Sequence, residues 1–224
     1  MDIQYVGHSC FRLRGKEGIV ITDPFQSSVG FSMPSLRADV VTVSHGHDDH
    51  NNSKAVGATT NREKPFIVQE AGEYEVGGIT VFGYPTWHDD QKGSERGRNI
   101  MYSIFIDDIH VLHLGDLGHS LDEKTIEAIP AVDVLLCPVG GVYTINAKVA
   151  SEVIGALEPA MVIPMHYRTE QHDAKTFAEL ATVEEFMKEY GKTAQTQDKL
   201  RIAGAKAGEE GETELIVLEP KVSD

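Results

Sequence analysis

The segment Ser44-His45-Gly46-His47-Asp48-Asp49-His50 gathers potential metal ligands directly behind a continuous apolar run at residues 40–43. Such a run is typical of a strand that is buried on both faces. In an extended chain His45 and His47 project to the same side, and a turn after them lets Asp49 and His50 face a second point nearby. Imidazole and carboxylate groups are ligands that zinc and similar divalent metals prefer. The segment therefore predicts a metal-binding loop at a strand end, in preference to a polar loop with chance histidines.

The overall charge of the chain limits its partners. Its 224 residues include 35 acidic and 20 basic side chains, which gives a formal net charge of −15. This excess argues against a general binder of long nucleic acid or of an anionic membrane, because both need a basic face. The sequence contains no apolar run of about 18 residues, so no transmembrane helix is expected. The N-terminal residues do not resemble a signal peptide. Cys10 and Cys137 cannot form a disulfide framework. We therefore expect a soluble cytoplasmic protein.

Short β-rich stretches alternate with turns, and helical patterns follow in the second half of the chain. Helices are expected from about residue 120, at 146–157 and at 176–190, where apolar residues recur at helical spacing. The acidic, glycine-rich residues 208–214 are expected to form a hairpin loop, and the stretches around it are expected to close a second sheet. Strands are expected at residues 3–6, 10–13, 18–22, 40–43, 65–68, 79–84, 100–106, 109–114, 132–137, 160–163, 199–202 and 214–218.

The order of these elements predicts the fold class. Strands come first in each half and helices follow, and no linker separates the halves. A chain of this length can bury one sizeable core. We therefore predict an α/β (α+β) layered arrangement of two sheets in a single domain over residues 1–224, with two similar halves at about 1–98 and 99–224.

The histidine-rich segment matches the His-x-His-x-Asp-His signature of the metallo-β-lactamase superfamily. The resemblance continues along the chain in the order of the family's further motifs, each of which follows a predicted strand. The matching residues are Asp23 in Thr22-Asp23-Pro24, His88 after Trp87, Asp116 in Gly115-Asp116 and His166 in Met165-His166-Tyr167. This resemblance implies a four-layer αββα sandwich of two mixed sheets, with the metal ligands gathered at one edge.

Carried over residue by residue, the resemblance implies a centre for two divalent metal ions. One ion would be held by His45, His47 and His88. The other would be held by Asp49, His50 and His166, with Asp116 bridging the two and Asp23 supporting the loop. Zinc is the expected metal, and manganese, nickel or iron are alternatives.

The opening Gly7-His8-Ser9 resembles the branch of the superfamily that includes ascorbate-6-phosphate lactonase. Segments around Asp116 and His166, and Pro138-Val139-Gly140-Gly141, resemble predicted zinc-dependent hydrolases of that branch. By this resemblance His8 points toward the metal edge, where it could donate a hydrogen bond, move a proton or contact substrate. The match specifies a fold and a metal centre better than a substrate.

The remaining polar candidates could support the ligands or contact a substrate. His113 could orient Asp116 or a metal ligand, and His119 could reach the pocket or cap the following helix. His110 and His172 are interpreted as surface residues. An anionic substrate could be bound by the basic side chains Arg96, Arg98 and Arg168, which would form a local positive patch if they converge, and Tyr143 could also contact it.

These residues predict a metal-dependent hydrolase. A hydroxide activated by two metal ions would attack a small ester, lactone or phosphoester, expected to be anionic, with Asp49 receiving the proton of water and His8 protonating the leaving group. One alternative is a phosphodiesterase or nuclease acting on short nucleic acid, and another is a metal-binding protein without catalysis. The sequence leaves the oligomeric state open, with a homo-oligomer as one option.

Overall fold

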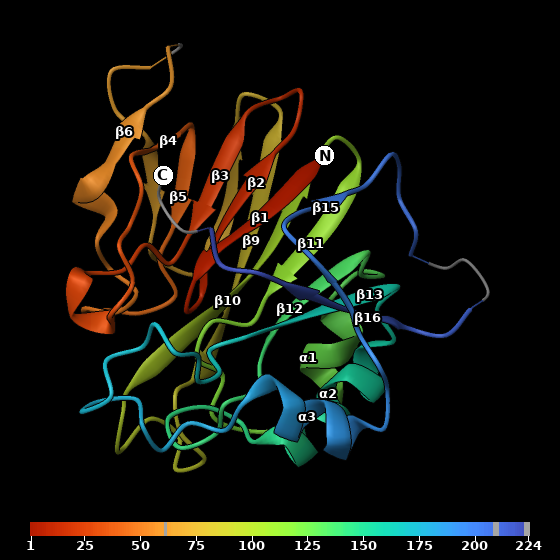
Figure 1. Cartoon of the computed structure of the whole chain (residues 1–224). Coiled ribbons are helices and arrows are strands. Elements are labelled where there is room, and N and C mark those ends of the chain that lie inside the picture. The colour runs from red at the N-terminus through yellow and green to blue at the C-terminus, as the bar shows by residue number, and fades with distance from the viewer. Residues whose placement is uncertain (61, 208–210, 222–224) are drawn as a thin grey trace.

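The β-rich stretches near the N-terminus form a six-stranded mixed sheet, which confirms the expected antiparallel meander (Figure 1). The meander runs through β1, β2 and β3, whereas β3, β5 and β7 are parallel. In spatial order the strands are β15 (Leu200–Arg201), β1 (Asp2–Gly7), β2 (Cys10–Arg14), β3 (Ile19–Thr22), β5 (Val40–Thr42) and β7 (Phe66–Val68). The computed structural model describes residues 1–60, 62–207 and 211–221.

The second sheet has eight strands and begins before the expected midpoint of the chain. Both β8 and β9 precede residue 98, so the two sheets do not divide the chain there. The expected hairpin around Asp107 and Asp108 is confirmed, and both aspartates have positive φ. In spatial order the strands are β14 (Gln195–Gln197), β16 (Glu214–Leu218), β13 (Met161–Met165), β12 (Val134–Pro138), β11 (Ile109–His113), β10 (Arg98–Ile106), β9 (Ile79–Trp87) and β8 (Gly72–Val76).

One strand assignment from the sequence was wrong. Residues 199–202 were expected in the second sheet, but Leu200 of β15 pairs with Ile3 of β1 at the edge of the first sheet. The chain crosses between sheets there because β1 offers an open edge, and the ammonium group of Met1 also bonds to the carbonyl of Ile202. A separate pair, β4 (Leu36–Ala38) and β6 (Val56–Ala58), lies beside the first sheet.

The first sheet has an apolar surface on both faces, because its side chains alternate in direction along each strand. One face packs against the second sheet and forms the main core. The residues of this face include Tyr5, Phe11, Val20 and Val40. The opposite face, which includes Val6, Cys10, Ile21 and Val41, packs against loop residues such as Phe25 and Phe31. Both faces of these strands are therefore buried.

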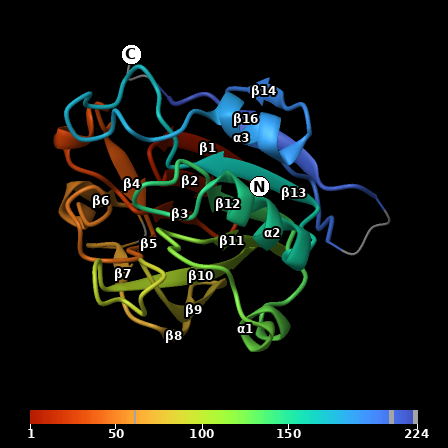
Figure 2. The same cartoon turned by 90° about the horizontal axis from the view of Figure 1, so that it is seen from below.

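The helices accompany the second sheet, as Figure 2 shows for α2 and α3. They are α1 (Glu123–Ala128), α2 (Ala147–Leu157) and α3 (Val183–Tyr190), and the side chains of Asp122 and Asn146 cap the first two. Beside the first sheet, the helical elements within the described residues are the 3-10 turns η1 (Ser27–Val29) and η2 (Ser53–Ala55). The layered α/β sandwich is thus confirmed, with α-helices on the side of the second sheet.

The helix expected at residues 176–190 begins only at Val183. Phe177 and Leu180 pack into the core on the outer face of the first sheet, whereas Phe186 belongs to the main core cluster, which also contains residues of α2 and of the second sheet. One helix cannot serve both cores, so the chain turns between them. Thr182 then starts α3 with a capping box, in which its side chain and that of Glu185 bond to each other's backbone N–H groups. This Thr-x-x-Glu signal is present in the sequence.

Two further expectations concern loops and membranes. The hairpin loop predicted at 208–214 lies partly outside the described residues, which omit 208–210. Within the described part of the chain, no helix is long and apolar enough to cross a membrane.

Candidate metal centre

The predicted ligands all follow strands that end at one edge of the two sheets. His8 follows β1, Asp23 follows β3, His88 follows β9 and His166 follows β13, and the histidine-rich segment comes shortly after β5. The backbone leaves three of these strands in the left-handed region, with φ of 55° at His8, 36° at Asp23 and 53° at His166. Such conformations are uncommon outside glycine and cluster at functional sites.

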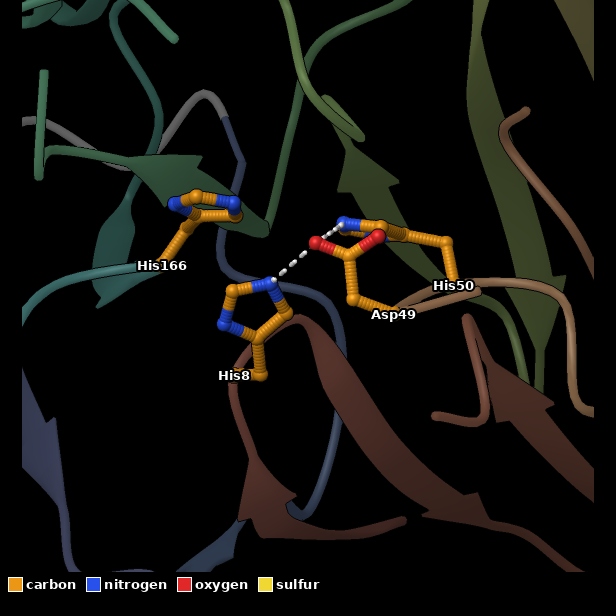
Figure 3. Close-up of side chains that lie close together, drawn as sticks. All are labelled: His8, Asp49, His50 and His166. Atoms are coloured by element: carbon orange, nitrogen blue, oxygen red, sulfur yellow. Dashed lines mark ion pairs between the residues drawn. The ribbon is translucent and has the colours of Figure 1, made fainter. Parts of the chain in front are cut away.

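Among the described residues, three overlapping groups of side chains converge at this edge, and two of them contain the expected ligand sets, the third being Asp23, His45 and His50. In each group the potential ligand atoms lie within 4.8 Å of one another. One group is His45, His47 and His88, the set expected for the first ion. Another contains the second expected set, Asp49, His50 and His166, together with His8, and Figure 3 shows these four side chains facing one another.

Asp116 lies between the two groups that contain the expected ligand sets. Its Oδ2 atom is 3.2 Å from Nε2 of His50, 3.2 Å from Nε2 of His166 and 3.4 Å from Nε2 of His88. Nε2 of His45 is 3.9 Å away. One carboxylate oxygen thus faces ring nitrogens from both groups, which is the arrangement expected of a bridging ligand.

Buried polar atoms without hydrogen-bond partners are concentrated at this edge. Among the described residues, nine buried side-chain N or O atoms have no such partner, and seven of them belong to His8, His45, His50, His88, Asp116 and His166. The Nε2 atoms of His45, His50 and His166 each lie near Asp116 but do not form a hydrogen bond with it. Leaving buried polar groups unpaired is costly. Divalent metal ions would satisfy the ligand atoms among them, such as Nε2 of His45, His50 and His166, so the residues present fit a metal centre.

The charges of the centre depend on one another. Burial, together with the neighbouring His50, lowers the pKa of His45 to about 3, against an opposing effect of Asp116. Burial also opposes the charged form of His50, but Asp116, Asp23 and Asp49 raise its pKa well above the usual value. In Asp116, burial is outweighed by His166 and His50, which hold the pKa of the carboxyl well below its usual range. The carboxylates of the centre are therefore ionised.

Asp23 supports the centre from beneath, as the resemblance implied. Its Oδ1 atom accepts a 2.8 Å hydrogen bond from the Ser44 backbone N–H, and Oδ2 lies 2.5 Å from the Ser44 hydroxyl oxygen. Oδ2 also lies 2.9 Å from Nδ1 of His50. A carboxylate that accepts from Nδ1 leaves the Nε2 lone pair of the imidazole free for a metal.

The structure places His113 beneath the loop, away from the Asp116 side chain. The Gly115 N–H donates to Nδ1 of His113, so Nε2 carries the proton and donates to the carbonyl of Ser9 at 2.9 Å. Orientation of Asp116 comes instead from Asn99, which the sequence analysis missed. The Asn99 Oδ1 atom accepts from the Asp116 N–H at 2.9 Å, and its amide group donates to Thr86 and to the carbonyl of Leu114.

Two histidines expected at the surface are buried, so that interpretation was wrong. His110 is 3% exposed, because its ring nitrogens bond to Ser103 and to the carbonyl of Ala131 and its ring stacks on Phe105. His172 is 7% exposed and lies with its Nε2 atom 3.1 Å from Nδ1 of His8. The other ring nitrogen of His8 is 3.3 Å from Oδ2 of Asp49.

A polar cavity of about 410 Å³ opens beside His88. Arg96, His119 and Tyr143 line it, and the Arg96 guanidinium lies 5.9 Å from the centre of the Tyr143 ring. His119 accepts from the Trp87 N–H and does not cap α1. His119 lines the cavity, which agrees with the other role expected for it, that of reaching the pocket.

The three basic candidates do not converge. Arg98 begins β10 opposite Trp87 and does not line the cavity beside His88. Arg168 donates to the carbonyl of Ala178 and lines a different pocket. The expected positive patch is therefore reduced to Arg96, because the strand direction and the loop after β13 carry the other two side chains elsewhere.

Asp89 shapes the loop that carries Arg96, and the sequence analysis did not single it out. Its carboxylate accepts hydrogen bonds from the backbone N–H groups of Gln91, Gly93, Glu95 and Arg96, at 2.7–3.1 Å. Burial opposes the charge, but these bonds hold the pKa of Asp89 at about 2. Because the Asp89 carboxylate accepts these four backbone hydrogen bonds directly after His88, it fixes the conformation of the loop beside the cavity.

Comparison with known proteins agrees with this geometry. The family model described as the beta-lactamase superfamily domain matches residues 2–166. A UPF0173 metal-dependent hydrolase of Thermoplasma acidophilum is 31% identical over 191 residues, which cover 75% of this chain and 84% of that protein. The chain therefore belongs to the metallo-β-lactamase superfamily. Within it, the chain falls in a family of metal-dependent hydrolases.

Solved structures show the same fold. A structure from Thermotoga maritima, assigned to the Zn-dependent hydrolases of the metallo-beta-lactamase superfamily, has 32% identity and a TM-score of 0.76, covering 97% of this chain and 99% of that one. Igni18, a metallo hydrolase from Ignicoccus hospitalis, has 23% identity and a TM-score of 0.64, covering 85% of this chain and 90% of that chain. The second likeness concerns the fold alone.

Proposed function

We propose that the protein hydrolyses a small anionic ester, lactone or phosphoester with a pair of divalent metal ions, zinc being the expected metal. The observation that carries this proposal is the position of Asp116 between two groups of ligand atoms. The histidine set beside His88 would hold one ion, and Asp49, His50 and His166 would hold the other. Two such ions supply a hydroxide near neutral pH and polarise the bond that is attacked.

The chain's own residues would bind and orient the substrate next to these ions. The cavity begins at His88, so a bound molecule would reach the first ion directly. Its volume of about 410 Å³ suits a small ligand. Arg96 can bind a carboxylate or phosphate with two parallel hydrogen bonds. The half-buried Asp49, at the rim of the second group, is placed to accept the proton released by water, as the sequence suggested.

Arg96 is the feature of the cavity wall that favours an anionic substrate, while Asp89 and Asp90 also line the cavity. The protein's net charge is −15, yet Arg96 places a positive group in the wall of the cavity. The sequence resemblance to the branch of ascorbate-6-phosphate lactonase supports the same class, an anionic ester or lactone. A long nucleic acid would need a basic track, and the separation of Arg98 and Arg168 from the cavity provides no such track.

Activity with defined metal content tests this proposal. The protein is stripped with a chelator and reloaded with zinc, manganese or nickel, and then assayed against carboxylic esters, lactones and phosphodiesters with and without a negative charge. We expect metal-dependent turnover that is highest on small anionic substrates. Highest activity on short oligonucleotides would favour the nuclease alternative. Inactivity of the fully loaded protein on all classes would favour metal binding without catalysis.

Metal stoichiometry tests the ligand assignment independently of activity. Replacing Asp49 or His50 with alanine is expected to lower the content from two ions per chain toward one. His110→Phe is the control matched to His50, because both histidines are buried but His110 lies within β11 and is bonded to Ser103. Two ions per chain in both the Asp49 and His50 variants would refute the assignment.

A further inference from the structure

Two hydrogen bonds and one close polar contact connect the backbone of Thr169 through two histidines to Asp49. Nδ1 of His172 lies 3.1 Å from the Thr169 backbone nitrogen and 3.1 Å from its hydroxyl oxygen. Nε2 of His172 lies 3.1 Å from Nδ1 of His8, and Nε2 of His8 lies 3.3 Å from Oδ2 of Asp49. The contact between His8 and Asp49 is the one drawn between them in Figure 3.

The Thr169 N–H determines which atom donates and which accepts in each of the following contacts. A backbone N–H is always a donor, so Nδ1 of His172 must be the acceptor of the Thr169 N–H. The proton of the neutral His172 ring then sits on Nε2. That N–H points at Nδ1 of His8, which must in turn accept. His8 is therefore left with its proton on Nε2, facing Asp49.

We infer that His172 and the Thr169 backbone lock His8 in its Nε2–H tautomer, with that N–H facing Asp49 at the 3.3 Å contact, so that His8 is a positioning residue and not a metal ligand. Distance alone would allow the opposite, because the Nε2 atom of His8 belongs to the same group of ligand atoms as Asp49, His50 and His166. Ligation would need the His8 proton on Nδ1. That tautomer would force a proton onto Nδ1 of His172, directly against the Thr169 N–H.

The packing around His8 makes a rotation of the ring unfavourable. His8 is fully buried, its ring lies 4.0 Å from that of His166 between centroids, and Phe177 packs against it at 5.1 Å. The backbone of His8 is held as well, because its carbonyl accepts from the Tyr5 hydroxyl and from the His166 N–H, both at 2.9 Å. The Nε2–H group thus faces Asp49 from a fixed direction.

If His8 does not bind the second ion, the proposed centre keeps one ligand position on that ion that no protein side chain fills. With the His8 proton on Nε2, the second ion would take Asp49, His50 and His166 plus the bridging Asp116, and a position would stay available to water or substrate. This role rests on the proposed function, but the tautomer of His8 exists with or without metal. The two can therefore be tested separately.

Nitrogen NMR of histidine-labelled protein tests the inference. Long-range proton–nitrogen spectra of the metal-free protein should show His8 and His172 as Nε2–H tautomers. After loading with cadmium-113, scalar coupling to the metal is expected for the predicted ligand histidines but not for His8. Either an Nδ1–H tautomer of His8 or a cadmium coupling to His8 would overturn the inference. A failure to bind cadmium would count against the proposed centre while leaving the tautomer result intact.

A variant tests the part played by His172. His172→Phe removes the donor to His8, so we expect mixed His8 tautomers and an affinity for the second metal equivalent that is about tenfold lower. His110→Phe is the matched control and should change neither the His8 tautomer nor the affinity for the second metal equivalent. Unchanged tautomers and unchanged affinity in a folded His172→Phe protein would remove His172 from the proposal. If that variant does not fold, the spectra of the unmodified protein still decide the tautomers of His8 and His172.

Discussion

Asp23 and His50 come from different loops but meet beneath the metal edge, where Oδ2 of Asp23 lies 2.9 Å from Nδ1 of His50. This contact keeps a proton on Nδ1 of His50, so that Nε2, which faces Asp116, is the nitrogen that a metal ion would take. In Asp23→Asn the amide can donate to Nδ1, which moves the ring proton to Nε2 and blocks ligation. We expect the affinity for one of the two ions to fall about 10- to 100-fold, measured by titration in metal-buffered solution.

The control for Asp23→Asn is Asp39→Asn. Asp39 is a buried acid in the same part of the fold, and it accepts from the Ile19 N–H and the Thr59 hydroxyl, away from the metal edge. This variant is expected to lose stability without changing metal affinity. Equal affinity loss in both variants would mean that the effect of Asp23 comes from general destabilisation.

Gly118 allows the end of β9 to approach the loop after Asp116. A Cβ atom at this position would collide with the backbone of His88 and Asp89, and the Gly118 N–H already bonds to the carbonyl of Trp87 at 3.0 Å. Gly118→Ala should therefore displace His88. Because a shift of about 1 Å at a reacting centre can cost about 100-fold in rate, we expect a loss of that order in kcat/KM, together with weaker binding of the first ion.

Gly155→Ala is the matched control for this substitution. Gly155 is exposed within α2, and a Cβ atom there meets nothing within 4 Å. Alanine is the better helix former, so this variant should be more stable than the original by up to about 1 kcal/mol, with unchanged activity. If Gly118→Ala bound both ions as tightly as Gly155→Ala does, the close contact would not position His88.

The convergence of the candidate ligands could be predicted because much of the information for it is local. Each ligand sits directly behind a recognisable apolar strand, and the spacing within His45 to His50 itself reports which side chains share a side. Parallel and antiparallel strands that end at one edge bring such residues together without further detail. The order of the motifs, read together with the family resemblance, was therefore enough to anticipate the two groups beside Asp116.

The supporting residues could not be predicted in this way, because their roles depend on tertiary contacts. His172 meets His8 across 164 positions of sequence, and the apolar spacing at 176–190 predicted a helix where Phe177 and Leu180 instead pack against the first sheet. Asn99 reads as an ordinary strand residue until the Asp116 loop lies over it. The sequence also could not distinguish Arg96 from Arg98. Arg96 lies at the cavity only because of the loop conformation that the Asp89 carboxylate holds.

His110 gives the protein a pH-dependent stability that is separate from the metal edge. Burial lowers its pKa below 6.5, against smaller raising effects of the Ala131 carbonyl and Asp133. When the pH falls through about 6.5, the unfolded chain binds a proton that the folded chain does not, so the folded state loses stability. His110→Phe lacks this proton and should be less stable than the original at pH 7.5, because it loses two hydrogen bonds.

We therefore expect the stability difference between the original protein and His110→Phe to narrow on acidification. The narrowing can reach at most about 1.4 kcal/mol per pH unit below 6.5. Denaturant unfolding of both proteins at pH 7.5 and 5.5, in the same metal-loaded state, measures it, because the titration of the metal edge is common to both. Parallel loss of stability in the two proteins would contradict a lowered pKa for His110.

Arg96 is the residue on which the proposed preference for anionic substrates depends. Its guanidinium is held beside Tyr143 in the cavity that begins at His88, and a hydrogen bond to a charged group is worth about 1.5–3 kcal/mol. Arg96→Gln should thus lower kcat/KM about 10- to 100-fold on an anionic substrate, mainly through KM, and leave a neutral analogue within about twofold. Arg98→Gln, outside the cavity, should affect neither substrate. Equal losses on both substrates in Arg96→Gln would show that Arg96 supports the loop and does not recognise the anion.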